Sequence, residues 1–128
     1  LQLDIYQSED IKIAFVLEQL GREEEAKPFY QSYFDFAKND QSIYKDLILS
    51  SYYAAVGDIE KGIKHLKAFS EQENYQYWFV LFLLEDPILL KMKDHPDFKS
   101  TTQKIQSKFW EAHEDMKTIL VERDILEQ

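Results

Sequence analysis

Apolar residues recur at three- and four-residue intervals along most of the chain, which is the spacing of an amphipathic α-helix. The first such segment is predicted to begin at Ser8, whose hydroxyl suits an N-cap, and to end at Gly21. A second begins at Glu23, where acidic residues suit the positive end of a helix, and ends at Asn39. Pro28 lies inside this second helix and is expected to remove one backbone hydrogen bond.

The pattern then repeats. A third helix is predicted to begin at Gln41 or Ser42 and to end at Gly57, and a fourth covers 59–69. The segment 75–84 is apolar almost all round, as expected of a helix covered on more than one side. A short helical turn at 89–90 and one long helix over 97–121 follow. Because no stretch alternates with a period of two, the sequence predicts an all-α protein.

Two glycines mark an internal repeat. Gly21 and Gly57 are separated by 36 positions, and a small residue follows each of them five positions later, Ala26 or Gly62. A glycine can end a helix in the left-handed conformation, and a small residue lets a second helix approach the first closely. The repeat therefore predicts two similar helical hairpins.

A helical hairpin of this length and spacing resembles the tetratricopeptide repeat. The resemblance implies a single domain, 1–128, built as a tetratricopeptide-like α-solenoid: a right-handed stack of helical hairpins with a long C-terminal capping helix. Repeat 1 would cover about 8–38, repeat 2 about 41–71, and a degenerate third unit with the cap about 75–121. Asp10 and Asp46 depart from the family, which has Trp there. The alternative is an ordinary helical bundle whose two glycine turns happen to align.

The end of the chain carries a second resemblance. The run 78–84, followed by Glu85-Asp86-Pro87-Ile88-Leu89 and Asp94-His95-Pro96-Asp97-Phe98, is similar to the closing segment of bacterial signalling proteins that end in such repeats. This resemblance implies the C-terminal docking or sensor module of a larger multidomain regulatory protein.

Composition narrows the function. The chain has 15 basic and 24 acidic residues and a net charge of −9, so direct binding of nucleic acid or of an anionic membrane is not expected. Without cysteine it has no disulfide and no thiolate metal site. Its longest strongly apolar run, Trp78 to Leu84, is too short to cross a bilayer, and the protein is expected to be cytoplasmic.

No catalytic pattern is present in the sequence. His65, His95 and His113 are far apart and lack metal-ligand spacing, and no phosphate-binding glycine loop or nucleophile motif occurs. We therefore expect neither an enzyme nor a cofactor or metal site.

The resemblance implies that the first helix of each hairpin lines a groove for a protein or peptide partner. The residues at the matching positions are Ser8, Ile11, Phe15, Glu18, Gln19, Tyr44, Leu47, Ser51, Ala54, Ala55, Tyr75 and Phe79. Because this set has no Lys/Arg clamp, an apolar or neutral segment is expected to bind. The alternative for each residue is burial against a neighbouring helix.

The predicted last helix has an apolar seam of heptad-like spacing. The seam residues are Phe98, Thr102, Ile105, Phe109, Ala112, Met116, Ile119 and Arg123. The seam either caps the stack throughout, or its far end projects and pairs with a partner or a second copy. Residues Phe109, Trp110, Met116 and Leu120 are the candidates for such self-association.

The sequence thus favours a protein–protein interaction scaffold. Two alternatives remain. One is a homodimerisation module acting through the C-terminal helix. The other is a small-molecule sensor with a pocket among Tyr33, Tyr53, Tyr77 and Trp78.

Overall fold

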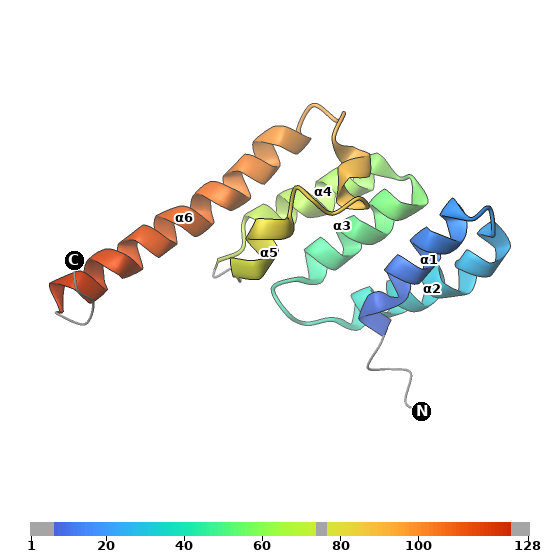
Figure 1. Ribbon diagram of the computed structural model, residues 1–128, viewed down its shortest axis with the longest axis horizontal. Helices are drawn as coiled ribbons and strands as arrows, with labels where there is room; N and C mark the ends of the chain where they lie inside the picture. The colour runs from blue at the N-terminus through green and yellow to red at the C-terminus, as the bar shows by residue number, and fades with distance from the viewer. Residues whose placement is uncertain (1–6, 74–76, 124–128) are drawn as a thin grey trace.

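The computed structural model describes residues 7–73 and 77–123, and over these residues the protein is all-α, as predicted (Figure 1). The helices, in chain order, are α1 (Asp10–Gln19), α2 (Glu23–Asn39), α3 (Lys45–Val56), α4 (Ile59–Ser70), α5 (Tyr77–Phe82), the 3-10 helix η2 (Leu89–Met92) and α6 (Phe98–Glu122).

The first four helices form two hairpins with the same turn. Gly21 has a φ of 75° and Gly57 a φ of 90°, so both adopt the left-handed conformation that the sequence predicts. In each turn the residue after the glycine donates its amide to a carbonyl five positions earlier, at 2.9 Å from Arg22 to Leu17 and from Asp58 to Tyr53. This bond is the hallmark of a Schellman helix end, and it reverses the chain in both places.

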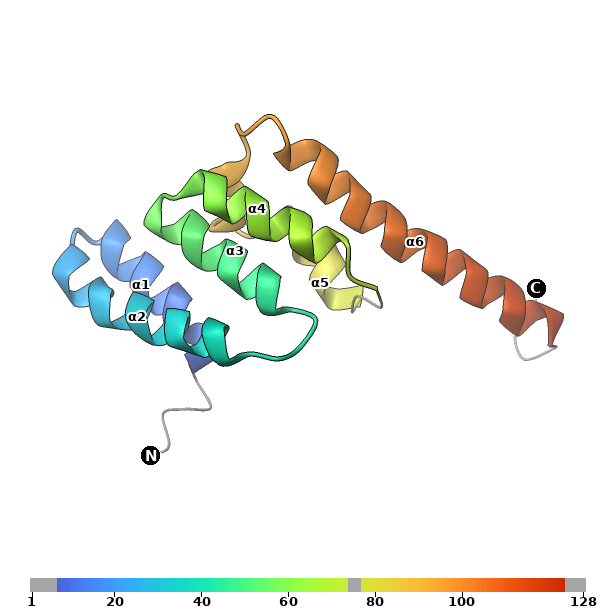
Figure 2. The same ribbon diagram turned by 180° about the vertical axis from the view of Figure 1, so that it is seen from behind.

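The two hairpins lie side by side, with α3 in contact with both α1 and α2 (Figures 1 and 2). Within the second hairpin Gly62 allows α4 to approach α3, and the Ser50 hydroxyl donates to the Gly62 carbonyl at 2.7 Å. A Cβ atom on Gly62 would lie 2.6 Å from the sulfur of Met92. Ala26, at the matching position of the first hairpin, is also fully buried.

The segment after α5 crosses the second hairpin on the side of α3. Figure 1 shows α5 and this segment in front of α3 and α4, and Figure 2 shows them behind. Ile88, Leu89 and Met92 are buried, and η2 contacts α3 and α4. The Lys91 ammonium donates to the Ala55 carbonyl at 3.0 Å, which fixes η2 on α3.

The N-terminal half of α6 packs along α4. Phe98, Thr102 and Ile105 of the predicted seam are buried. The Lys108 ammonium donates to the carbonyls of Ser70 at 3.1 Å and Gln72 at 2.8 Å, at the end of α4. The bond to Ser70 satisfies a carbonyl group that the helix C-terminus leaves without an intrahelical partner, and the bond to Gln72 fixes the chain just after it.

The far half of α6 has much less cover. Met116 is 62% exposed and Ile119 49% exposed, although both continue the seam that is buried at Ile105. The helix has 25 residues and is therefore about 37 Å long. Figure 1 shows its C-terminal part extending beyond the other helices, as the second interpretation of the seam predicts.

Two local predictions are wrong. Glu9, not Ser8, precedes α1, and it makes no side-chain cap bond. The third helix begins at Lys45 instead of Gln41 or Ser42, because Asp40 accepts from the amide and hydroxyl of Ser42 and holds a turn there. In the apolar segment after residue 75, which was expected to be covered on more than one side, Val80 and Leu83 are buried whereas Leu81, Phe82 and Leu84 are exposed.

Candidate functional site

An apolar pocket of about 630 Å³ lies between α1 and the segment 82–89. On one side Ile11, Phe15 and Val16 of α1 line it, and on the other side Phe82 and Leu83 are among the lining residues. Tyr33 of α2 and Ser51 of α3 complete the lining. The pocket therefore draws on three of the four hairpin helices and on the chain that follows α5.

The spacing of the α1 residues explains why they share this pocket. Ser8, Ile11, Lys12 and Phe15 follow one another at three- and four-residue intervals, so they lie on one face of the helix. The opposite wall is held in shape by Asp86. Its carboxylate accepts from the amide of Ile88 at 2.8 Å and, less closely, from that of Leu89 at 3.4 Å.

The phenol of Tyr33 is a buried polar group of the pocket. Burial raises its pKa above the usual value, and the negative charge of Asp86 raises it further, while a hydrogen bond with Ser51 acts in the opposite direction. Tyr33 is therefore neutral at physiological pH.

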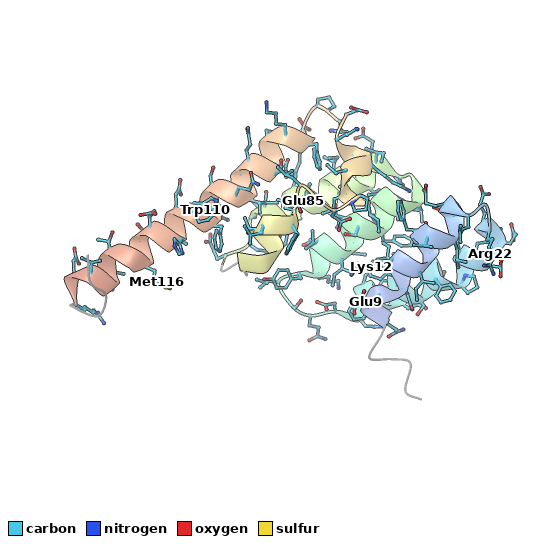
Figure 3. The ribbon with its side chains drawn as sticks, in the orientation of Figure 1. Glu9, Lys12, Arg22, Glu85, Trp110 and Met116 are labelled. Atoms are coloured by element: carbon cyan, nitrogen blue, oxygen red, sulfur yellow. The ribbon has the colours of Figure 1, made fainter. Side chains whose placement is uncertain are left out.

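The charged side chains around the opening of the pocket differ in whether they are paired. Lys12 of α1 is paired with Glu9 at 2.8 Å, and both side chains are exposed. Glu85, on the segment after α5, is exposed, and its carboxylate makes no ion pair within the described residues. Figure 3 labels Glu9, Lys12 and Glu85 and shows the two elements that carry them.

The structure brings part of the predicted groove together. Ser8, Ile11, Phe15 and Ser51 line the pocket. Glu18 lies 4.0 Å from the Lys91 ammonium, outside the lining, and Gln19 is exposed elsewhere on α1.

The remaining groove candidates have other surroundings. Tyr44 and Leu47 are half-buried and pack against the core, the ring of Tyr44 lying 5.7 Å from that of Phe69. Ala54 and Ala55 are buried within the second hairpin, so they offer no open groove surface. Tyr75 and the side chain of Phe79 lie outside the described part of the chain.

Sequence reasoning missed the second wall of the pocket. Phe82, Leu83 and residues 85–89 line it, but the apolar run before Asp86 has no polar face from which an orientation can be read. The available signal was Asp86-Pro87, which ends a helix and forces the chain to turn.

The tyrosines proposed for a small-molecule pocket do not form one together. Tyr33 lines the pocket beside α1, whereas Tyr53 stacks on the ring of His65 at 5.4 Å and is absent from that lining. The side chains of Tyr77 and Trp78 lie outside the described part.

A second exposed surface lies on the far half of α6. Trp110 is 45% exposed, and its ring lies 5.1 Å from that of Phe109 and 5.7 Å from that of His113. Met116 and Ile119 extend the surface toward the C-terminus. The side chain of Leu120 lies outside the described part.

The histidines on α4 and before α6 each contact one carboxylate. His65 contacts Asp46 at 2.9 Å and His95 contacts Glu60 at 3.1 Å. Within residues 7–73 and 77–123, no group of three or more His, Asp or Glu side chains is arranged to hold a metal ion.

No protein-family model, curated protein or solved structure matches the chain. Among the helices described, none combines the length and the apolar character needed to span a bilayer.

Proposed function

We propose that the chain is a protein-interaction module that receives an apolar side chain of a partner in the pocket between α1 and the segment 82–89. The pocket itself carries the proposal, because it is concave, mostly apolar and placed where the first helix of a repeat would line a groove. Four residues predicted for that groove, Ser8, Ile11, Phe15 and Ser51, line it.

The proposed fold is a short tetratricopeptide-like stack. Its support is the identical turn hydrogen bond at Gly21 and Gly57 and the buried small residues Ala26 and Gly62 at matching positions. A stack of this kind leaves the first helices of its hairpins available to a partner. In line with the resemblance of the tail, we propose that the module serves a larger regulatory protein.

The mechanism is burial of apolar surface. Val16 and Phe82 are 54% and 57% exposed, so a side chain inserted between them removes apolar area from water on both sides. Each Å² of apolar area so buried contributes roughly 25 cal/mol before the cost of association.

The test is a peptide-library selection on the wild-type protein, followed by affinity measurements on variants. Val16→Asp places a charge in the pocket, and we expect it to weaken the selected peptides at least tenfold. Leu20→Asp is the matched control, because Leu20 is 64% exposed close to the end of α1 but does not line the pocket. Equal affinity of both variants, or a selection without binders, would refute the proposal.

Self-association through α6 is a second candidate. It is favoured by the exposure of Met116 and Ile119 on a seam whose earlier residues are buried. Light scattering on residues 1–128 and on a chain ending at Lys108 decides the matter. Dimers of the longer chain alone would support it, and monomers of both would exclude it.

A small-molecule sensor remains a third candidate, now at the pocket beside α1. Its volume of about 630 Å³ falls in the range of ligand sites, about 300–1,000 Å³. A rise in melting temperature with a member of a metabolite panel, absent in Val16→Asp, would support it. No shift with any compound would count against it.

A further inference from the structure

The charges around the pocket favour a positively charged partner. Glu85 and Asp86 both line the pocket, and the described residues provide neither with an ion pair. The lining contains one ammonium group, that of Lys12, and Glu9 pairs with it. Counting Glu9, three carboxylates face one ammonium group, which leaves an excess of two negative charges.

The nearby Lys91 does not change this balance. Its ammonium lies 5.2 Å from the centre of the Phe15 ring, donates to the Ala55 carbonyl at 3.0 Å and lies 4.0 Å from Glu18. It belongs to the contacts that hold η2 and is not among the residues that line the pocket.

The raised pKa of the Tyr33 phenol is consistent with a negative electrostatic field in the pocket. The charges of Asp86, Glu9 and Asp40 all raise the pKa of its phenol, in addition to the larger effect of burial. A cation placed in the opening would therefore lie in a negative field from these carboxylates.

We propose that the docking segment is a peptide that carries lysine or arginine beside its apolar anchor, and that Glu85 and Asp86 receive this cation. The inference rests on the proposed function of the pocket and adds the chemistry of its partner. It differs from the apolar or neutral segment expected from the sequence, because Glu85 and Asp86 lie outside the groove positions that led to that expectation. An acidic segment would be repelled by the same carboxylates.

The experiment begins with a random peptide library selected on the wild-type protein. The tightest binder is then synthesised in three forms, with its basic residues beside the apolar anchor kept, changed to glutamine, or changed to glutamate. We expect the basic form to bind about tenfold more tightly than the glutamate form at low salt, with the glutamine form between them. High salt should reduce the difference, because the carboxylates are near the surface.

Charge reversal in the protein locates the effect. Glu85→Lys should remove the preference for the basic form while leaving the glutamine form bound. Glu111→Lys is the matched control, since it alters the net charge equally at an exposed position on α6 away from the pocket. It should leave the preference unchanged.

The outcomes separate this inference from the proposed function. Binders without basic residues beside the anchor, or equal affinity of the three forms, overturn the inference and leave the docking function in place. An equal effect of Glu111→Lys also overturns it, because the preference would then arise from the total charge. A library without any binder overturns both.

Discussion

Replacing Gly62 by alanine tests how closely the second hairpin and η2 are packed. A Cβ atom there would lie 2.6 Å from the sulfur of Met92, and at ordinary contact distances of 3.4 Å from the Ala54 nitrogen and 3.5 Å from the Ser50 oxygen. Only Met92 must therefore move, and its side chain is fully buried. The contact matters for the pocket because Met92 seats the segment that forms the second wall.

Two effects oppose each other in Gly62→Ala. Alanine is favoured over glycine inside a helix by about 1 kcal/mol. Forcing an extra methyl group into a well-packed core costs about 1–3 kcal/mol. We expect the clash to prevail and the free energy of unfolding to fall by about 1 kcal/mol.

Introducing Gly62→Ala into a protein that also carries Met92→Val removes the clash. Met92→Val lacks the sulfur, so in that protein the helix preference of alanine acts alone and Gly62→Ala should become stabilising by about 1 kcal/mol. Gly21→Ala is the control. Its φ of 75° makes alanine unfavourable by about 1–2 kcal/mol, and the surrounding space is open, so Met92→Val should not alter its effect.

Urea unfolding followed by far-UV circular dichroism measures all of these proteins. The reasoning fails if Gly62→Ala is as stable as the wild type, or if its effect has the same sign in both backgrounds. Either result would mean that α4 and η2 do not approach as closely as the structure shows.

Three further predictions concern stability. Lys108→Met should lower the free energy of unfolding in urea by about 1–2 kcal/mol, because the charge-assisted hydrogen bonds at the end of α4 are lost. Lys104→Met breaks the more exposed ion pair with Glu71 and should lower the free energy of unfolding by less. Equal losses in the two variants would contradict this. Pro28→Ala should raise the free energy of unfolding by about 1–3 kcal/mol, because an exposed proline inside α2 removes a backbone hydrogen bond of the helix. Calorimetry that shows no rise in melting temperature would disprove this reasoning. Because burial raises the pKa of Tyr33, the unfolded chain ionises first. Stability should therefore hold up to about pH 10 and fall above it, less steeply in Tyr33→Phe, as alkaline unfolding curves would reveal.

The helical hairpins were predictable because α2 and α4 each have a distinct polar face and a glycine follows α1 and α3 closely. The intervals in α2 and α4 identify their buried residues, and Gly21 and Gly57 mark the turns through a property of glycine alone. The start of α3 was harder to predict. Asp40 and Ser42 have side chains suited to either a cap or a turn, and only the three-dimensional contacts select the turn.

The pocket was only half predictable. The α1 wall follows from helical spacing. The wall formed by residues 82–89 depends on where Met92 and Ile88 are buried, and these contacts join residues far apart in the sequence. The uncovered end of α6 was foreseeable from its length, since a helix of 25 residues is longer than the helices it can pack against.

The two walls of the pocket are translated far apart in time. Residues 7–73 contain the α1 wall, Tyr33 and Ser51, but Phe82 and Asp86 leave the ribosome later, followed by Met92, which packs at Gly62. A chain that ends after both hairpins therefore lacks the second wall of the pocket. The proposed docking therefore requires residues 82–92 in addition to both hairpins.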